Sequence, residues 1–366
     1  MNNTLGLYIH IPFCRSKCPY CDFFSCRASE SDYDNYIKCL KNIMKYHSEI
    51  IDKEIDTVYF GGGTPSVLGA DRIAGILEYT RECFSVSNKA EITMEANPAS
   101  GKFFDFARIA EFGVNRISLG MQSSNQKELK ALGRLHSAED VENTIKLIRK
   151  AGINNISLDL MMGIPYQTVE SLRDSIDFCV AQNVSHISSY ILKIEKGTIF
   201  EKRYDSYDFP SDEEAADLYL FAVDYLSKNG FEQYEISSFC KKGFESRHNL
   251  KYWTLGEYLG IGPAAHSFID GKRFYYDRSF ENFEKNIIRS EGEGGTTEEY
   301  IMLGLRLKRG LDLTECKKIL GEKGSENLLK TSEKFVKAGL MEQKNNHLNF
   351  TPKGFLVSNA VLAQII

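Results

Sequence analysis

The strongest constraint on the fold is a regular alternation of short apolar segments with amphipathic ones in the first half of the chain. The longer segments place apolar residues every three or four positions, as helices that pack on a sheet require. This alternation is typical of right-handed β-α-β units with a parallel sheet. It predicts an α/β fold, an open or partial (β/α)6 barrel with functional residues at the carboxyl ends of its strands. The six strands are expected at residues 5–11, 57–60, 91–96, 116–120, 156–162 and 186–192.

After Leu192 the alternation stops, and three parts of the chain are predicted. Residues 1–195 form the barrel, and residues 196–290 extend it through a long helix, a short strand and a hairpin at Asp270-Gly271. The stretch EGEGG (291–295) reads as a linker. Residues 297–366 combine helical segments with a short hairpin and so predict a winged-helix-like module. Its mixed charge favours packing or partner docking over DNA binding.

Three of the nine cysteines are clustered, and the other six are scattered. Cys14, Cys18 and Cys21 have the spacing C-x3-C-x2-C, which points to metal or redox chemistry rather than to disulfides. A structural zinc site normally takes four protein ligands, and only Cys26 is available nearby as a fourth. A [4Fe–4S] cluster held by three thiolates instead leaves one iron open for a small molecule. The cluster is the favoured interpretation.

Polar residues follow several of the expected strands. YFGGGTP (59–65) places three glycines directly after the second strand, where a tight turn or a close approach to a ligand explains them. Glu95, Gln122 and Asp159 end or interrupt apolar strands, and Arg134 lies in LGRLH. A carboxylate in such a strand is costly unless it binds a ligand or forms a core ion pair, for example Asp159 with Arg134.

The charge balance narrows the partners. A net charge of -5 and a pI near 5.9 provide no general basic field, so nucleic acid is not expected. No apolar run reaches the length of a membrane span, and the N-terminal residues lack the pattern of a signal peptide. A cytoplasmic protein is expected.

With Tyr20 before the last cysteine, the cysteine motif resembles the signature of the radical S-adenosylmethionine (radical SAM) superfamily. The resemblance implies that Cys14, Cys18 and Cys21 bind a [4Fe–4S] cluster and that S-adenosylmethionine binds its open iron. It also implies an electron donor such as flavodoxin or ferredoxin. The glycines after the second strand match the superfamily's glycine motif, which holds the methionyl amino group.

The runs YIHIPFC, GGGTP, EANP, GVNRISLGMQS and DLMMGIPYQT, in this order, resemble the coproporphyrinogen III dehydrogenase-like branch of that superfamily. By this resemblance Tyr8, Gly62 and Glu95 contact the cluster-bound S-adenosylmethionine. Another set matches positions associated with a second S-adenosylmethionine. That set is Tyr20, Gly63, Thr64, Gln122, Arg134 and Asp159.

Two features distinguish the subgroups of this branch. The porphyrinogen-oxidising enzymes carry a further cysteine where this chain has Phe23, and CPYCDFFS instead resembles the HemW-type haem chaperones. RHNLKYW (247–253) matches the H-N-x-x-Y-W motif of that group, which is associated with haem. His248 is therefore the first candidate haem ligand. His266, in a glycine-rich turn, is the second, either at the cofactor pocket or on haem.

Two functions of different classes follow from the resemblance. The first is a haem chaperone that binds the cluster, S-adenosylmethionine and haem and transfers haem to an acceptor haemoprotein, including a membrane-bound one. The second is an oxygen-independent coproporphyrinogen III dehydrogenase, which converts propionates to vinyl groups by radical oxidative decarboxylation. Phe23 and the H-N-x-x-Y-W match favour the chaperone and argue against dehydrogenase activity.

Overall fold

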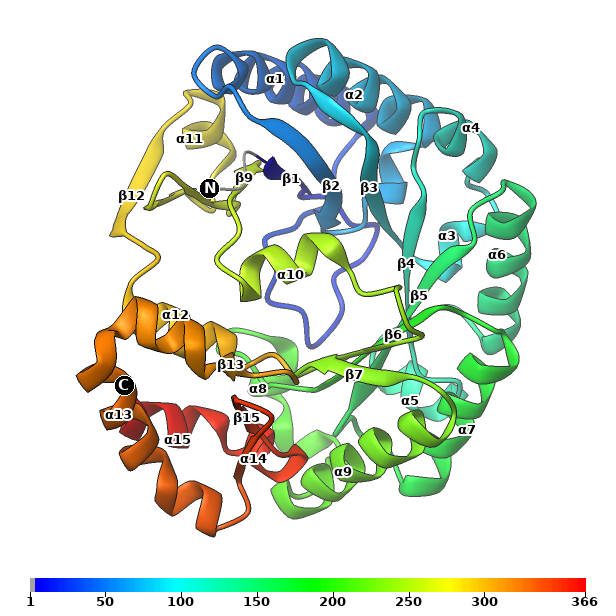
Figure 1. Ribbon diagram of the computed structural model, residues 1–366. Coiled ribbons are helices and arrows are strands. Elements are labelled where there is room, and N and C mark those ends of the chain that lie inside the picture. Colours follow the sequence, from blue (N-terminus) through cyan, green and yellow to red (C-terminus); the bar gives the residue numbers. More distant parts are fainter. Residues whose placement is uncertain (1–3) are drawn as a thin grey trace.

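The computed structural model describes residues 4–366, and its central feature is a run of six parallel strands in chain order (Figure 1). All six lie where the sequence predicts them, so the α/β class is confirmed. Each parallel neighbour is joined by a crossover that contains a helix. The strands are β1 (Thr4–Ile11), β2 (Glu54–Gly62), β3 (Val86–Ala96), β4 (Arg116–Gln122), β5 (Asn155–Met162) and β6 (His186–Ile191).

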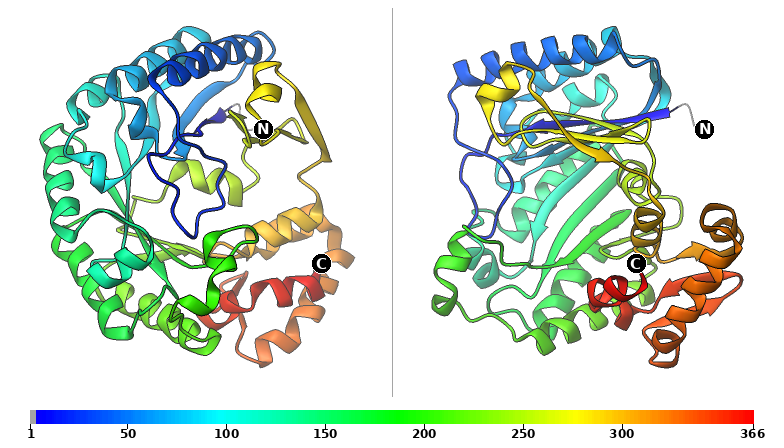
Figure 2. Two further views of the ribbon diagram at one scale, coloured as in Figure 1. Left: turned by 180° about the vertical axis from the view of Figure 1, so that it is seen from behind. Right: turned by 90° about the vertical axis from the view of Figure 1, so that its left-hand side faces the viewer.

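The crossover helices cover the outside of this sheet (Figures 1 and 2). Several begin at a capping box, in which a Ser or Thr hydroxyl and the side chain three residues later satisfy free N–H groups. Between β3 and β4 the chain forms two short helices, and the Asp105 side chain caps the second of them. The helices are α1 (Glu30–Ser48), α2 (Ala70–Cys83), α3 (Pro98–Gly101), α4 (Phe106–Glu111), α5 (Gln126–Ala131), α6 (Ala138–Lys150) and α7 (Val169–Ala181).

The two faces of the sheet differ in chemistry. On β4, Ile117 and Leu119 join the fully buried hydrophobic core beneath the helices. Arg116 and Ser118, which alternate with them, face a cavity inside the curved sheet. The same alternation recurs on β3 and β5, so the concave side of the sheet is polar. A sheet with this pattern is ready to hold a polar ligand inside.

Both edges of the six-stranded run are extended. β9 (Tyr258–Ile261) pairs parallel with β1 and continues into antiparallel β10 (His266–Ile269), β11 (Lys272–Tyr276) and β12 (Ile288–Glu293). Asp270 and Gly271 both have positive φ and form the expected hairpin turn. The predicted linker at 291–295 is wrong in its first part, because residues 291–293 belong to β12.

The other edge carries β8 (Ser238–Cys240) and β7 (Glu232–Glu235), which completes a twelve-stranded sheet within residues 4–366. The edge strands β12 and β7 are not paired with each other. Figure 1 shows α12 (Thr297–Gly304) lying between them. The segment after α12 bonds to β7 through Lys308 N–H and the Tyr234 carbonyl. The sheet is therefore a partial barrel closed by helical structure.

One short helix lies inside the ring of strands. α10 (Arg247–Trp253) occupies the centre in Figure 1 and carries the H-N-x-x-Y-W motif. Ser246 caps it, and the Glu91 carboxylate accepts hydrogen bonds from the N–H groups of Arg247 and His248. Glu91 lies on the amino-terminal half of β3, so α10 plugs the barrel at that end.

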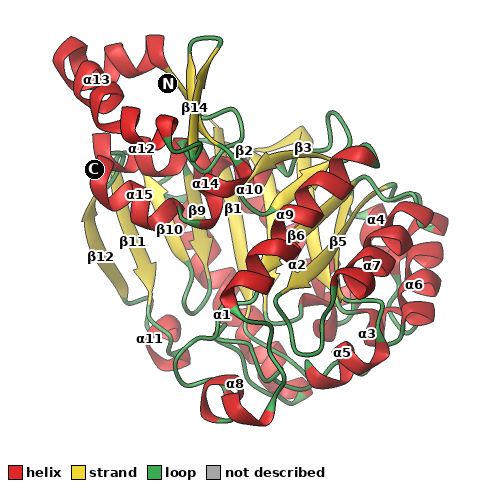
Figure 3. Cartoon of the chain, turned by 90° about the horizontal axis from the view of Figure 1, so that it is seen from below, coloured by secondary structure: helices red, strands yellow, loops and turns green. Residues whose placement is uncertain are grey.

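The last part of the chain has the predicted helices and hairpin (Figure 3). α13 (Leu313–Lys337) contains Gly321 with φ 75° and ψ 170°, which separates the two helical segments expected there. A three-stranded sheet has the order β13 (Leu311–Asp312), β15 (His347–Phe350), β14 (Met341–Lys344). α14 (Pro352–Leu356) and α15 (Ser358–Ile365) complete the module.

Two further helices, α8 (Ile199–Lys202) and α9 (Asp212–Lys228), connect the barrel to its extension. None of the helices in residues 4–366 is long and apolar enough to span a membrane.

Candidate functional site

A cavity of about 700 Å³ opens at the carboxyl ends of the barrel strands. It lies between the concave face of the sheet and the loop that follows β1. Most of the residues selected from the sequence line this one cavity, although they come from six separate segments. They are Cys14, Cys18, Tyr20, Cys21, Gly62, Gly63, Thr64, Glu95, Gln122, Arg134 and Asp159.

The cysteine loop is closed at its base by backbone hydrogen bonds. Cys14 N–H donates to the Cys26 carbonyl, and Cys26 N–H donates to the Pro12 carbonyl. Within the loop Cys21 N–H donates to the Cys18 carbonyl, which turns the chain so that all three cysteines face the cavity. The three thiols are half-buried. Cys26 is exposed and supports the base of the loop through its backbone.

The cysteine geometry suits an iron–sulfur cluster better than a single ion. Among residues 4–366, no three His, Cys, Asp or Glu side chains lie close enough together to bind one metal ion. A cluster needs only one thiolate on each of three irons, spread around one space. Burial raises the pKa of the Cys21 thiol, and binding to iron would overcome this effect by deprotonating it. The loop therefore fits a cluster with one iron left open.

Around the loop, two polar side chains contact the thiols. Thr64 Oγ1 lies 3.5 Å from Cys14 Sγ, and Arg134 Nη1 lies 3.8 Å from Cys18 Sγ. Arg134 also donates to the Gly120 carbonyl on β4. We call the cysteine loop (14–26), Gly62, Gly63, Thr64 and Arg134 the rim of the cavity. Arg134 gives the rim a positive charge, which would stabilise thiolates and the anionic cluster that they would hold.

The glycines after β2 have a structural role at the rim. A Cβ on Gly63 would lie 2.5 Å from the Phe13 carbonyl oxygen, and Gly62 has φ 110° with His10 equally close to its Cβ position. The N–H groups of Gly63 and Thr64 donate to the carbonyls of Ile11 and Phe13. These N–H groups hold β2 against the start of the cysteine loop, so a ligand meets the glycine surface and the Thr64 hydroxyl.

Two buried carboxyl groups lie deeper in the cavity. Burial raises the pKa of Glu95 to about 7, and the nearby Asp159 charge adds to this shift. Burial likewise raises the pKa of Asp159 to about 6. Tyr59 donates to Glu95 at 2.9 Å, and Ser118 donates to Asp159 at 3.0 Å.

The core ion pair considered for Asp159 and Arg134 does not form. The hydrogen bonds of Asp159 come from Ser118 and Ser188, and Arg134 affects it through charge alone. Both carboxyl groups therefore stand ready to accept hydrogen bonds from a ligand.

The remaining predicted contacts differ in position. Gln122 ends β4 with φ 69° and accepts a hydrogen bond from Tyr190. Tyr20 is held beside Cys18, and burial raises its pKa. Tyr8 lies one layer further in, with its hydroxyl 3.0 Å from His10 Nδ1 and its ring 6.1 Å from that of Tyr59.

His248 is fully buried and both of its ring nitrogens have partners. Nδ1 lies 2.8 Å from Thr57 Oγ1, and Nε2 lies 2.9 Å from the Tyr252 hydroxyl. Burial lowers the pKa of His248 to about 3, so the imidazole stays neutral. Its neighbour Asn249, rather than His248 itself, lines the cavity. In this conformation Tyr252 must move before His248 can bind a metal.

His266 lies outside the cavity lining. It is exposed on β10, stacks on Tyr275 with ring centres 5.1 Å apart, and pairs with Glu291 at 3.1 Å. The structure does not bring it together with the cysteine loop.

Sequence reasoning missed Arg116. It is the first residue of β4, is 1% exposed, and lines the cavity. Its Nε has no hydrogen-bond partner. The sequence gives no clear signal of its burial, because an arginine at the start of the strand in NRISLG is equally typical of an exposed strand end. The neighbouring position on β3, Thr93, also has a buried hydroxyl without a partner.

We call the cavity-lining residues Tyr59, Arg116 and Asn249, together with Thr93, which is buried between Tyr59 and Arg116 in the sheet, the floor of the cavity. Tyr59 and Thr93 are paired in register, and Thr93 is paired with Arg116, so three of these residues form one row across β2, β3 and β4. α10 supplies Asn249 from the plugged end.

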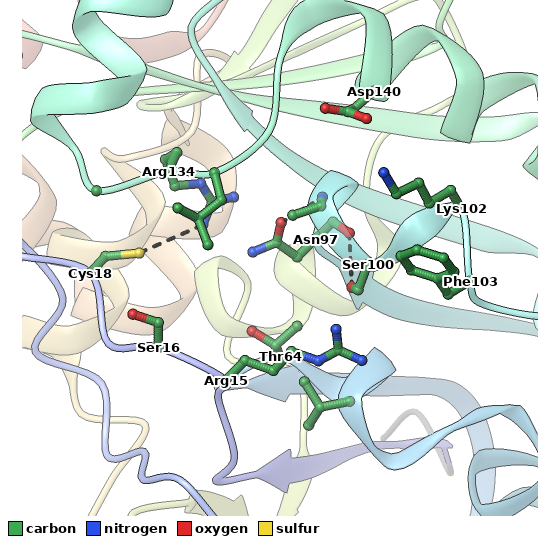
Figure 4. Close-up of a pocket in the computed structure, with 14 residues that line it drawn as sticks. Arg15, Ser16, Cys18, Thr64, Asn97, Ser100, Lys102, Phe103, Arg134 and Asp140 are labelled. Atoms are coloured by element: carbon green, nitrogen blue, oxygen red, sulfur yellow. Dashed lines mark hydrogen bonds between the residues drawn. The ribbon is translucent and has the colours of Figure 1, made fainter.

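A smaller pocket of about 280 Å³ borders the rim from outside (Figure 4). It shares Cys18, Thr64 and Arg134 with the main cavity. Figure 4 shows Lys102 and Phe103 at its outer side, and Phe103 is 75% exposed. The rim can therefore be reached from solvent by a small molecule or an electron donor.

Comparison with known proteins gives consistent matches. Residues 8–179 match the radical SAM superfamily and residues 297–357 match the HemN C-terminal domain. A protein of Lactococcus lactis named heme chaperone HemW is 33% identical over 98% of this chain and 96% of its own length. The heme chaperone HemW of Escherichia coli is 38% identical over 73% and 72%.

Among solved structures, coproporphyrinogen III oxidase (HemN) from Escherichia coli superposes with a TM-score of 0.84. It is 21% identical and covers 99% of this chain and 89% of its own. This likeness supports the fold, including the part that follows the barrel.

Proposed function

We propose that this chain, which belongs to the HemW family of the radical SAM superfamily, binds haem and transfers it to an acceptor protein. One observation carries the proposal. The three cysteines at the rim and Asn249 of the H-N-x-x-Y-W motif line the same cavity, although more than 200 residues separate them. A single cavity can therefore contact both a cluster and a porphyrin.

The residues present fit a [4Fe–4S] cluster and S-adenosylmethionine. When bound, the cluster would supply an open iron for the amino acid part of S-adenosylmethionine and a route for single electrons. Cys14, Cys18 and Cys21 would hold the cluster, and Thr64 and Arg134 would hydrogen-bond its sulfur ligands. Glu95 would accept hydrogen bonds from S-adenosylmethionine beside Gly62. Gln122 and Asp159 extend the polar wall for a second molecule.

The HemW assignment argues against porphyrinogen oxidation. Phe23, which stands where the oxidising enzymes have a further cysteine, lines the cavity and is 64% exposed. No thiol is supplied at that position. We therefore propose that the chain lacks coproporphyrinogen dehydrogenase activity and that electrons from a flavodoxin or ferredoxin serve a regulatory step.

The test is anaerobic reconstitution of the cluster, followed by haem titration and a coproporphyrinogen turnover assay on the same sample. We expect stoichiometric haem binding without decarboxylation. Transfer is checked by mixing the haem-loaded protein with an apo-haemoprotein and following the haem spectrum. Formation of protoporphyrinogen at a catalytic rate would overturn the proposal in favour of the dehydrogenase.

Two variants separate ligation by His248 from a structural role. His248→Gln removes the imidazole and should abolish binding of this residue to the haem iron, while the glutamine amide can still bond to Thr57 or Tyr252. Tyr252→Phe removes only the hydroxyl that engages Nε2 and should leave haem binding intact or stronger. If both variants bind haem with a wild-type spectrum, His248 is not the ligand.

A further inference from the structure

Arg116 has no explained role at the floor of the cavity. A guanidinium is always charged at neutral pH, and burying one without a partner costs several kcal/mol in principle. Arg116 is 1% exposed, and its Nε makes no hydrogen bond. Such a group is retained where it meets an anion that the protein alone does not supply.

The nearby carboxyl groups do not neutralise it directly. The hydrogen bonds to Glu95 come from Tyr59 and the Gly62 N–H, and those to Asp159 come from Ser118 and Ser188. Arg116 influences both carboxyl groups only through its charge. Glu91 is another buried carboxylate near this cavity. It already accepts hydrogen bonds from two N–H groups at the amino terminus of α10.

The surroundings of Arg116 suit a carboxylate on a flat aromatic ligand. Asn249 and Ser118 line the same space as Arg116. Thr93, opposite Arg116 in the register, has a buried hydroxyl without a partner but does not itself line the cavity. The Tyr59 ring forms part of the same floor and lies 5.2 Å from the His248 ring beneath it. The floor thus combines hydrogen-bond donors with aromatic surface.

Arg116 lies far from the rim of the cavity. Arg116 lies six residues before Gln122 on β4, which corresponds to roughly 20 Å along a strand. The cysteines, Gly63 and Arg134 are all at the other end of the cavity. A ligand that reaches Arg116 extends through the cavity towards α10.

We propose that Arg116 forms a carboxylate-binding subsite at the cavity floor and that a propionate of the porphyrin occupies it. Arg116 would donate two parallel hydrogen bonds to the propionate, with Asn249 and Ser118 beside it. The porphyrin would then have one edge against α10 and the other towards the rim. This inference rests on the proposed haem-binding function. It adds that the protein recognises haem through one of its propionates.

The first test needs no variant. The reconstituted wild-type protein is titrated with haem and with haem dimethyl ester, in which both propionates are blocked. We expect the free acid to bind about tenfold or more tightly, as a buried charge-assisted pair requires. Equal affinities would overturn the subsite but leave haem binding itself standing. Failure to bind either form would instead contradict the proposed function.

The second test assigns the effect to Arg116. In Arg116→Gln the advantage of haem over its ester should disappear, and in Arg116→Lys, which keeps the charge, part of it should return. Arg278→Gln is the control, because Arg278 also lines the cavity but is exposed and paired with Asp22. It should keep the full advantage. An unchanged preference in folded Arg116→Gln would overturn the assignment.

S-adenosylmethionine is the other carboxylate that the cavity could hold. Its affinity for the reconstituted protein is measured in the same variants. We expect Arg116→Gln to leave it unchanged. A loss of S-adenosylmethionine affinity together with a retained preference for haem over its ester would assign Arg116 to S-adenosylmethionine and overturn the propionate.

Discussion

The rim and the floor of the cavity differ in how the chain supplies their side chains. The rim is dominated by one continuous loop, residues 14–26, in which Cys14, Cys18 and Cys21 are half-buried and Cys18 also borders a side pocket. The floor is assembled from β2, β3, β4 and α10, and Arg116 there is fully enclosed. The rim is thus suited to exchange small molecules and electrons with the solvent, whereas the floor is suited to bind a ligand of one particular shape.

The same difference explains the energetic behaviour of each end. At the rim a substitution mainly removes a ligand of the cluster. At the floor, and at His248 which packs against its Tyr59, a substitution also removes hydrogen bonds and packing that stabilise the barrel. Four predictions test this division.

The largest expected effect is at the rim. Cys18→Ala should abolish the cluster, because only Cys14 and Cys21 would remain on the loop facing the cavity. Iron content and visible absorbance after reconstitution measure the loss. Cys26→Ala is the matched control, since Cys26 contributes backbone hydrogen bonds to the loop and its side chain is exposed. A full cluster in Cys18→Ala would disprove the ligand assignment.

The next effect belongs to His248, which is buried behind the floor. His248→Ala should lower the free energy of unfolding of the apo protein by about 3 kcal/mol, because it leaves Thr57 and Tyr252 unpaired around a small void. Denaturant unfolding of the apo protein measures it. His266→Ala, on the exposed surface, should cost far less. Equal costs for the two would show that the α10 plug does not stabilise the barrel.

The free energy of unfolding should depend on pH through Glu95, which lies between the rim and the floor. The pKa of Glu95 is raised to about 7, so the folded state binds its proton more tightly than the unfolded state does. Its contribution to stability is complete below the unfolded pKa, near 4.5, and is lost as the pH rises through 7. The loss amounts to about 3 kcal/mol.

Glu95→Gln removes this titration. Relative to wild type, the free energy of unfolding of apo Glu95→Gln should therefore rise by about 3 kcal/mol between pH 4.5 and 8. Denaturant midpoints across this range provide the measurement. Parallel curves for the two proteins would mean that Glu95 is not desolvated in the folded state.

The smallest effect is expected at Phe23. Phe23→Ser should change the free energy of unfolding by less than about 0.5 kcal/mol, because the ring is 64% exposed and Lys17 bonds only to the backbone carbonyl. The same denaturant measurement applies. A large loss would show that the ring packs on the loop and would return Phe23 to a structural role.

The sequence predicted the rim better than the floor for a physical reason. The spacing of Cys14, Cys18 and Cys21 places three thiols on one loop whatever the rest of the chain does. All six parallel strands were likewise visible as local apolar runs. Glu95, Gln122 and Asp159 could be placed at one end of the barrel because parallel strands share a direction.

The floor depends on contacts that no local pattern encodes. Arg116 looks like a surface residue at the start of a strand until the register with Thr93 and the curvature of the sheet enclose it. His248 looked like an open ligand because the hydroxyls of Thr57 and Tyr252 come from β2 and from the next turn of α10. Strands β9 and β12 were also missed, since β9 pairs with β1, which is far away in the sequence, and β12 adds to the hairpin of β10 and β11.

The position of β1 has a consequence for biosynthesis. β1 leaves the ribosome before the other strands described here, yet one of its two neighbours, β9, is made only when residues 258–261 emerge. Until then β1 and β2 have an open edge with free N–H and C=O groups, which is a template for wrong pairing. The barrel therefore completes late and through non-local contacts, so its folding should be slow and sensitive to chain termination before α12.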